Sequence, residues 1–161
     1  MKKYMLSAIA LSVLFSSTAI AHEKNNRKGY SHEGVKIAFG GAGFQSEFAP
    51  FGAPYEEGEG ASLMLGWGIS NDVTFWVSGL AVEYLGPDGE EIDTGFVGAD
   101  FSVQYKFSTQ SRLQPYGKLG LGFYGIGHDG DVFAGPGVAS GLGIDFFLTQ
   151  HVGIGLEVQH K

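Results

Sequence analysis

Residues 94–124 read TGFVGADFSVQYKFSTQSRLQPYGKLGLGFY and decide the fold. In the first half of this stretch apolar residues alternate with polar or small ones, and the pattern resumes after a polar connector at residues 108–112. Successive side chains of a β-strand point to opposite faces. The period of two therefore predicts two antiparallel strands, Thr94 to Phe107 and Leu113 to Tyr124, each with one apolar and one polar face.

The same alternation recurs along most of the chain, and no segment has convincing helical spacing. Five further strands are predicted, which brings the total to seven; they cover residues 35–44, 61–69, 73–84, 137–148 and 152–159. The connectors alternate between long and short. The long ones are residues 46–58, 85–93 and 125–136, and the short ones are residues 70–72, 108–112 and 149–151.

The first 21 residues have the pattern of a secretory signal peptide. Lys2 and Lys3 precede an apolar run, and small residues end in Ala21. The apolar run from Met5 to Phe15 is shorter than the roughly 20 residues of a membrane-spanning helix. We therefore predict a signal peptide at residues 1–21, a flexible polar segment at 22–33 and one β-barrel domain at 34–161.

The composition excludes several classes of function. After residue 21 the chain keeps 8 of its 10 Lys and Arg residues, since Lys2 and Lys3 are lost, against 17 acidic residues, for a net charge of -9. Such an acidic domain argues against nucleic acid as a partner. The chain has no cysteine, so it has no disulfide and no thiolate metal site. The sequence predicts no cofactor.

The polar face of the predicted strands favours a membrane barrel over a soluble one. This face is rich in glycine, which suits the crowded interior of a narrow barrel better than an outer surface. Long connectors alternating with tight turns, and strands near ten residues, are also typical of outer-membrane barrels. The glycines are Gly40, Gly66, Gly68, Gly98, Gly120, Gly122, Gly141, Gly143, Gly153 and Gly155.

The same face carries charges of both signs, which are predicted to pair across the lumen. We interpret them as a salt-bridge plug rather than as the gate of an ion pathway, because an eight-stranded barrel is just wide enough for side chains. Trp76 and Leu80 also point inward and are interpreted as core fill rather than as a bulge. The predicted lumenal charge network is Lys36, Asp100, Lys106, Lys118, Asp145 and Glu157.

Aromatic residues near strand ends are consistent with girdles at the membrane interfaces. They are Trp67, Tyr84, Tyr105, Phe107 and Phe146.

Three segments resemble the small bacterial outer-membrane β-barrel proteins related to the transmembrane domain of OmpA. LQPYGKLGLGFYGIG at residues 113–127 and GVASGLGIDFFLTQHVGIGLEVQHK at 137–161 resemble later strands, and SLMLGWGISNDVTFWVSG at 62–79 resembles an earlier hairpin. The resemblance implies an eight-stranded closed barrel, inserted from the periplasm with both ends on that side. Family members act as adhesins, envelope anchors or narrow pores, so fold alone does not choose a function.

The end of the chain departs from that pattern. Bacterial barrels close with an even number of strands, whereas seven are counted, and residues 159–161 lack the terminal aromatic that family members commonly present. Either the last strand is absent because the chain is truncated, or an irregular N-terminal segment completes the barrel. We favour truncation.

The long connectors hold two weaker candidates for binding. GHDGD at residues 127–131 offers Asp129 and Asp131 to a hard cation but lacks the further ligands of a calcium loop, so a solvated loop is favoured. Other acidic residues are candidates for contacting divalent cations that bridge lipopolysaccharide, or a basic host partner, but the favoured interpretation is that their charge keeps the loops soluble. These residues are Glu56, Glu57, Glu59, Asp88, Glu90, Glu91 and Asp93.

Catalysis is not predicted. Outer-membrane lipid A deacylases carry a His-x-Ser motif on a late strand, but His160 is followed only by Lys161, and Ser31 with His32 lies in the polar segment. A nucleophilic site needs a nucleophile, a base and an orienting group together.

We therefore predict a non-enzymatic outer-membrane barrel, with a role in envelope integrity or surface interaction. Its expected partners are outer-membrane lipid and lipopolysaccharide, the barrel-assembly machinery and a surface ligand at the acidic loops. The alternatives are a lipid A hydrolase truncated before its motif and a soluble periplasmic ligand-binding barrel.

Overall fold

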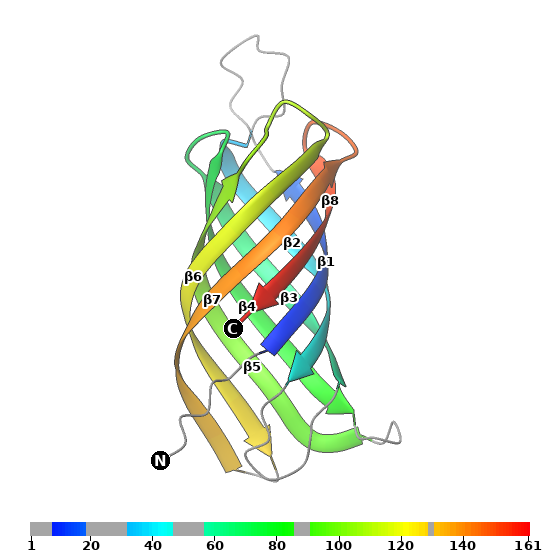
Figure 1. Ribbon diagram of the computed structural model, residues 1–161, viewed down its shortest axis with the longest axis vertical. Coiled ribbons are helices and arrows are strands. Elements are labelled where there is room, and N and C mark those ends of the chain that lie inside the picture. Colours follow the sequence, from blue (N-terminus) through cyan, green and yellow to red (C-terminus); the bar gives the residue numbers. More distant parts are fainter. Residues whose placement is uncertain (1–7, 19–31, 47–56, 86–90, 129–130) are drawn as a thin grey trace.

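The chain folds as a closed barrel of antiparallel β-strands, seen in a computed structural model that describes residues 8–18, 32–46, 57–85, 91–128 and 131–161 (Figure 1). Each strand pairs with its neighbours in the sequence, which confirms the predicted up-and-down topology. No helix among these residues is long and apolar enough to cross a membrane. The strands are β1 (Ala8–Thr18), β2 (Gly34–Ser46), β3 (Glu57–Gly68), β4 (Val73–Leu85), β5 (Glu91–Lys106), β6 (Leu113–His128), β7 (Asp131–Phe147) and β8 (Val152–His160).

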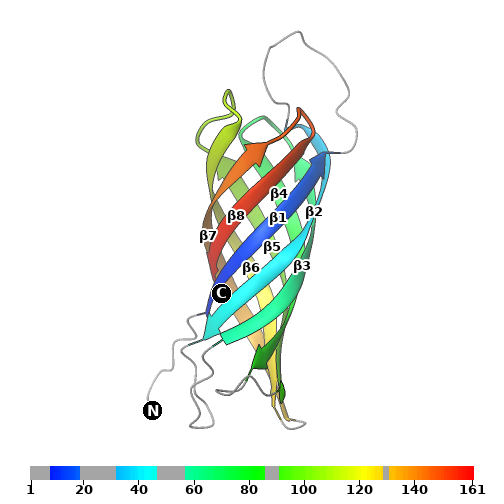
Figure 2. The same ribbon diagram turned by 90° about the vertical axis from the view of Figure 1, so that its right-hand side faces the viewer.

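Three short turns join the strands at one end of the barrel, between β3 and β4, β5 and β6, and β7 and β8 (Figure 2). In the first, Ser70 Oγ accepts hydrogen bonds from the backbone N–H groups of Asp72 and Val73. Thr149 Oγ1 does the same for His151 and Val152 in the third. Hydroxyl side chains that bond nearby backbone groups are typical of tight turns, so the predicted turns at residues 70–72 and 149–151 are confirmed.

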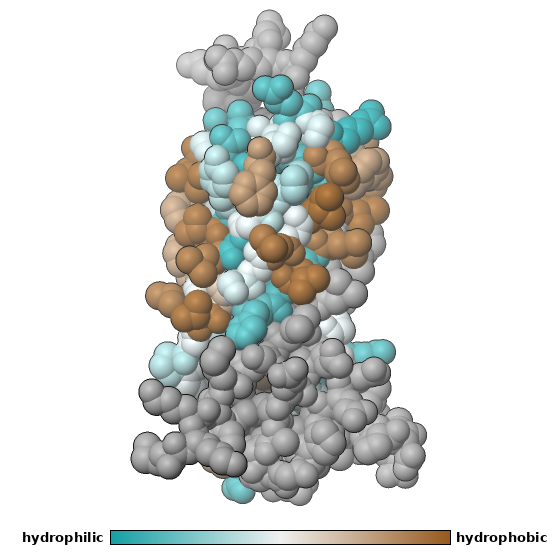
Figure 3. Space-filling model, viewed as in Figure 1, coloured by the Kyte–Doolittle hydropathy of each residue, from teal (hydrophilic) through white to brown (hydrophobic). Residues whose placement is uncertain are grey.

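Large apolar side chains cover the outside of the barrel, whereas charged side chains lie inside it, together with a cluster of buried apolar ones. Large apolar residues such as Leu119, Leu121 and Leu142 are exposed on the outer wall, while Asp100, Lys118 and other charged residues are buried. Figure 3 shows hydrophobic residues along the visible wall and hydrophilic ones gathered at the short-turn end. This arrangement inverts that of a soluble protein, whose apolar residues lie inside.

The hairpin of β6 and β7 is longer than the sequence predicts. Residues 125–136 are predicted to form a long connector, but they continue both strands, with Ile126 paired to Phe133 and His128 paired to Asp131. Backbone pairing needs no particular side chains, so glycine-rich and acidic residues that resemble a loop can still extend a ladder. Asp129 lies outside the described residues.

Acidic residues near the other connectors are also partly in strands. Glu57 and Glu59 belong to β3, and Glu91 and Asp93 belong to β5, so these four do not lie in loops as predicted. The remaining three acidic residues predicted in loops lie outside the described residues; they are Glu56, Asp88 and Glu90.

An eighth strand closes the barrel. The seven predicted strands correspond to β2–β8, and β1 lies between β2 and β8, paired with both. In the structure an N-terminal segment completes the sheet, as in the second of the two alternatives. Closure satisfies the backbone groups that an open edge would leave unpaired in lipid. Because β1 falls within residues 1–21, removal of a signal peptide would also remove this strand.

The aromatic residues at strand ends divide into two groups. Trp67, Tyr105, Phe107 and Phe146 are exposed on the outer wall near the short turns, as a girdle at that end requires. Tyr84 does not belong to a girdle, because its side chain is only 2% exposed and packs inside the barrel. It has the same parity as the inward residues of β4, so its direction follows from the strand alternation.

Trp76 and Leu80 are buried in the barrel interior, as predicted for core fill. The register irregularity in β4 lies further along, between Glu83 and Leu85.

Candidate functional site

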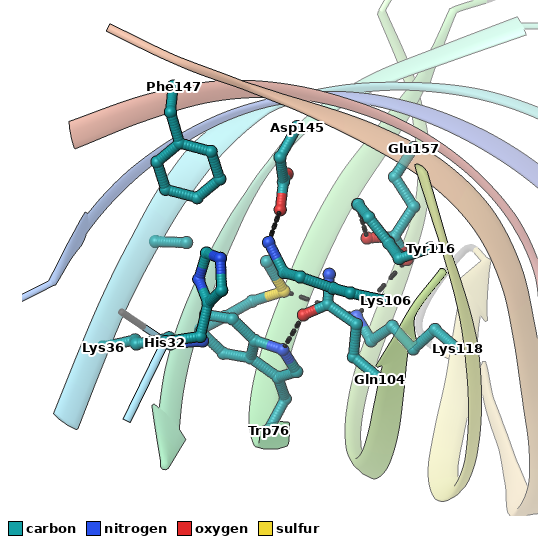
Figure 4. Close-up of a pocket in the computed structure, with 12 residues that line it drawn as sticks. His32, Lys36, Trp76, Gln104, Lys106, Tyr116, Lys118, Asp145, Phe147 and Glu157 are labelled. Carbon is teal, nitrogen blue, oxygen red and sulfur yellow. Dashed lines mark hydrogen bonds and ion pairs between the residues drawn. The ribbon is translucent and has the colours of Figure 1, made fainter. Parts of the chain in front are cut away.

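The six residues of the predicted lumenal charge network all lie inside the barrel, on inward positions of β2, β5, β6, β7 and β8. The structure brings four of them together as two ion pairs. Figure 4 shows the side chains of this region converging from strands on different sides of the lumen.

The first pair joins Lys106 on β5 to Asp145 on β7. Lys106 Nζ lies 2.6 Å from Asp145 Oδ2 and 3.1 Å from Gln114 Oε1, on the intervening strand β6. The ammonium group also lies 4.8 Å from the centroid of the Phe147 ring. A buried ammonium is costly unless it is paired and hydrogen-bonded, and this one meets a carboxylate, an amide oxygen and an aromatic face.

The second pair joins Lys118 on β6 to Glu157 on β8, with Lys118 Nζ 3.4 Å from Glu157 Oε1. Tyr116 donates its hydroxyl hydrogen to Glu157 Oε2 at 2.8 Å, and the amide of Gln159 donates to Oε1. Both oxygens of this carboxylate are therefore occupied. A carboxylate held by an ammonium, a phenol and an amide is the centre of a fixed network rather than a movable base.

Asp100 pairs with a residue that the sequence prediction did not include. Lys161 Nζ lies 2.7 Å from Asp100 Oδ2, and Ser78 donates its hydroxyl hydrogen to Oδ1 at 2.6 Å. The Lys161 ammonium also lies 5.4 Å from the centroid of the Tyr124 ring. Lys161 shares the parity of Glu157 and is separated from it by two full strand periods, so alternation in β8 was the signal that would have found it.

Lys36 on β2 does not join either of the two ion pairs. Its Nζ donates to Thr74 Oγ1 on β4 at 2.7 Å, and its side chain is buried. Nearby, Trp76 Nε1 donates to Gln104 Oε1 at 2.6 Å, which joins β4 to β5. Lys36 and Trp76 thus form hydrogen bonds inside the barrel although neither takes part in an ion pair.

His32 closes the short-turn end of the lumen, although the sequence placed it in a flexible segment. Its side chain is 1% exposed, and its ring meets that of Phe147 edge to face at a centroid distance of 5.0 Å. Its backbone N–H donates to Asn71 Oδ1 at 3.4 Å. Burial, reinforced by the positive charges of Lys106 and Lys36, lowers the pKa of His32 to about 2, so the imidazole is neutral. No sequence signal marked this residue.

The space between these side chains is a cavity of about 20 Å³, lined by both ion pairs, Lys36 and His32. A cavity needs roughly 10–15 Å³ to hold one water molecule, so this one has room for about one. The centre of the network is therefore filled by protein. The charges of this network bind one another and leave little volume for a substrate.

The structure adds no support for the candidate cation site at residues 127–131 or for a catalytic pair of Ser31 with His32. Within the described residues, no group of three or more His, Asp or Glu side chains is placed to hold a metal ion. Of the GHDGD segment, His128 and Asp131 are paired strand ends, while Asp129 lies outside the described residues. Ser31 also lies outside them.

Comparisons with known proteins were made by family model, by sequence and by structure. No family model matches the chain, and no curated protein matches it. Among solved structures, it is similar to the outer membrane protein OprG from Pseudomonas aeruginosa, with 13% sequence identity and a TM-score of 0.45. The alignment covers 96% of this chain and 91% of that chain. Membership of the OmpA-related family stays a prediction, and function must be argued from the geometry of the barrel.

Proposed function

We propose that this chain is an outer-membrane β-barrel protein with a sealed lumen, which acts without catalysis in envelope integrity or surface interaction. The observation that carries this proposal is the inverted barrel. An outer wall of exposed Leu, Val and Phe side chains is unfavourable in water and favourable in hydrocarbon. The outer membrane is the bacterial location typical of closed barrels of this size.

The interior supports a structural role rather than conduction. Two ion pairs, Lys106 with Asp145 and Lys118 with Glu157, lie across the lumen around a cavity of about 20 Å³. Conduction requires a path that ions can enter and leave. Side chains that bind one another and fill the lumen oppose such a path.

The end opposite the short turns is where we propose contacts with the surroundings. In the part of the chain that the structure describes, the charged residues of the strand segments at this end are all acidic: Glu57, Glu59, Glu83, Glu91, Asp93 and Asp131. Divalent cations that bridge to lipopolysaccharide phosphates, or a basic surface ligand, would complement them. Insertion through the barrel-assembly machinery is part of the same proposal.

Export through a cleaved signal peptide is also proposed, and it has a structural consequence. Cleavage after Ala21 would remove β1 and uncover the edges of β2 and β8. In lipid those backbone groups would need another strand. N-terminal sequencing of protein recovered from the outer membrane tests this step: a mature chain that begins at His22 supports cleavage, and one that retains Ala8 opposes it.

The experiment that tests the main proposal combines location with conductance. We expect the protein in the outer-membrane fraction, a gel mobility that changes on heating, and no current steps in planar lipid bilayers. A Lys118→Ser, Glu157→Ser double variant removes one pair of the plug and should admit ions if the barrel still folds. A matched double variant on the outer wall, Glu59→Gln with Glu83→Gln, should give no current steps.

Recovery of the wild type from the soluble periplasm would refute the membrane location and favour the ligand-binding barrel. Current steps with the wild type would refute the sealed lumen while leaving the location intact.

A further inference from the structure

In the part of the barrel that the structure describes, the lumen holds one lysine more than its carboxylates pair with. That lysine is Lys36, which is only 4% exposed and whose Nζ donates to the neutral hydroxyl of Thr74 at 2.7 Å. The three ion pairs are Lys106 with Asp145, Lys118 with Glu157 and Lys161 with Asp100. A buried ammonium is costly unless an opposite charge compensates it. Lys36 therefore favours one negative charge beside it.

Lys36 borders the cavity of about 20 Å³, together with His32 and Trp76. Figure 4 shows these side chains around the cavity. Such a volume holds about one water molecule. A halide ion is a single atom only slightly larger than water, whereas sulfate and phosphate are much larger. The cavity therefore suits a halide in size, and Lys36 supplies the positive charge that would attract it.

His32 presents an unpaired nitrogen inside the barrel. Its Nε2 is buried and has no hydrogen-bond partner among the described residues, whereas the ring has a hydrogen bond with Gln114. The amide nitrogen of Gln114 donates to the backbone oxygens of Thr109 and Ser111, so the Gln114 oxygen is the atom that serves the ring. The ring then donates Nδ1–H to Gln114, and Nε2 carries a lone pair. Protonation of Nε2 would turn this lone pair into an N–H donor.

The charges around the cavity couple this protonation to an anion. The titratable and charged side chains that line the cavity with His32 are Lys36 of β2, Lys106 of β5, Tyr116 and Lys118 of β6, Asp145 of β7 and Glu157 of β8. Burial and the charges of Lys106 and Lys36 lower the pKa of His32 to about 2. A negative ion beside Lys36 would oppose the effect of both lysines and raise the pKa of His32. By linkage, protonation of His32 would strengthen binding of the ion by the same factor.

We propose that this cavity takes up one halide ion together with one proton, with the ion between Lys36 Nζ and His32 Nε2 and the proton on Nε2. The ammonium and the imidazolium then both donate to the ion. The proton comes from the solvent, and the pair adds no net charge to the lumen. An ion held in a closed cavity is not a conducted ion, so the inference goes beyond the proposed function and concerns the interior alone.

Bromide quenching of Trp76 fluorescence tests the proposal, because Trp76 lines the cavity and a bound bromide would lie beside its indole. The full chain carries Trp67→Phe, which leaves Trp76 as the only tryptophan of the two. The barrel is refolded in phosphatidylcholine vesicles with sodium bromide at about pH 5, with sodium sulfate keeping the ionic strength constant. We expect quenching that saturates and that chloride reverses. Collisional quenching would rise without saturating, and chloride would not reverse it.

Two variants in this background separate the roles of the two side chains. Lys36→Met should abolish the saturable quenching. His32→Phe keeps a ring beside Phe147 but lacks the nitrogens, so its bromide affinity at about pH 5 should be about tenfold lower, the effect of one hydrogen bond to a charged group. Raising the pH to about 8 should weaken binding to the parent protein and leave His32→Phe unchanged.

The matched control neutralises an ion pair that does not line the cavity. Asp100→Asn with Lys161→Met removes one charge of each sign from the lumen and should bind bromide as the parent does. Quenching that does not saturate in the parent, that survives Lys36→Met, or that is equal at the two pH values would overturn the proposal. Heat-dependent gel mobility identifies the variants that fold, and if Lys36→Met does not, the chloride competition and the comparison of His32→Phe with the parent at the two pH values decide.

Discussion

Replacing Leu121 by Arg tests the orientation of the whole barrel. Leu121 lies near the middle of β6, is 69% exposed on the outer wall and is paired in register with the outward residues Phe101 and Val138. Fully burying a leucine is worth about 1.5–3 kcal/mol, so contact of this exposed fraction with lipid accounts for about 1–2 kcal/mol. The charge adds to that loss, and Arg near the bilayer midplane of a β-barrel costs about 2–4 kcal/mol in total.

The assay is equilibrium urea unfolding of the barrel in phosphatidylcholine vesicles, followed by the fluorescence of the two tryptophans. We expect Leu121→Arg to lower the free energy of unfolding by about 2–4 kcal/mol. Gln110→Arg, in an exposed short turn, is the control and should change it by less than about 0.5 kcal/mol. Equal stability of the two variants would show that Leu121 faces water, and the proposed orientation would be wrong.

Gln104→Arg, which places an arginine on the lumenal face, is not a mild control. Gln104 is buried, accepts a hydrogen bond from Trp76 and lies opposite Lys118 in the register. An arginine there would remove that acceptor and add a cation beside another one. The expected loss is therefore as large as that at Leu121, for an electrostatic rather than a hydrophobic reason.

Three further tests concern residues in the barrel interior. Gly66→Ala should destabilise the barrel by about 1–3 kcal/mol, because a Cβ there would lie 2.6 Å from an indole ring, whereas Gly79→Ala should be nearly neutral in the same urea assay. Lys118→Met should lower the free energy of unfolding by about 3–5 kcal/mol, because it leaves the buried carboxylate of Glu157 without its cation. Adding Glu157→Gln should recover part of that loss, and no recovery would mean that the two residues are not coupled. Because of His32, the free energy of unfolding should fall as the pH drops below 6.5, since the unfolded chain binds a proton that the native state excludes. By pH 5 the wild type should lose about 2 kcal/mol more than His32→Gln. Parallel pH profiles of the two proteins would contradict this.

The fold was predictable because a single signal repeats along the chain. Alternation placed Asp100, Lys106 and Lys118 on the inner face and Leu121 on the outer one, and strand geometry alone then dictated a barrel wall with two faces. Strand ends were less predictable, as at residues 125–136, because backbone pairing can continue through glycines that carry no pattern.

Partner choice inside the lumen was not predictable from alternation. Parity identifies which residues face inward, but pairing across the lumen depends on register and strand tilt, which a periodicity does not contain. Lys106 extends across β6 to Asp145, and Asp100 pairs with Lys161, which follows β8. His32 lay beyond any strand pattern, and its burial follows only from closure of the barrel end.

The polar interior also helps to select one strand register for the barrel. An outer wall of leucine, valine and phenylalanine meets hydrocarbon equally well after a strand slides by two residues, so lipid contact alone does not select one register. The lumenal ion pairs do select one register, because they join strands that are not adjacent. Lys106 of β5 pairs with Asp145 of β7, and Lys118 of β6 pairs with Glu157 of β8. A two-residue slip of β7 or β8 would separate these charges inside the barrel, where replacement partners are scarce. We therefore interpret the lumenal network as the element that fixes the register.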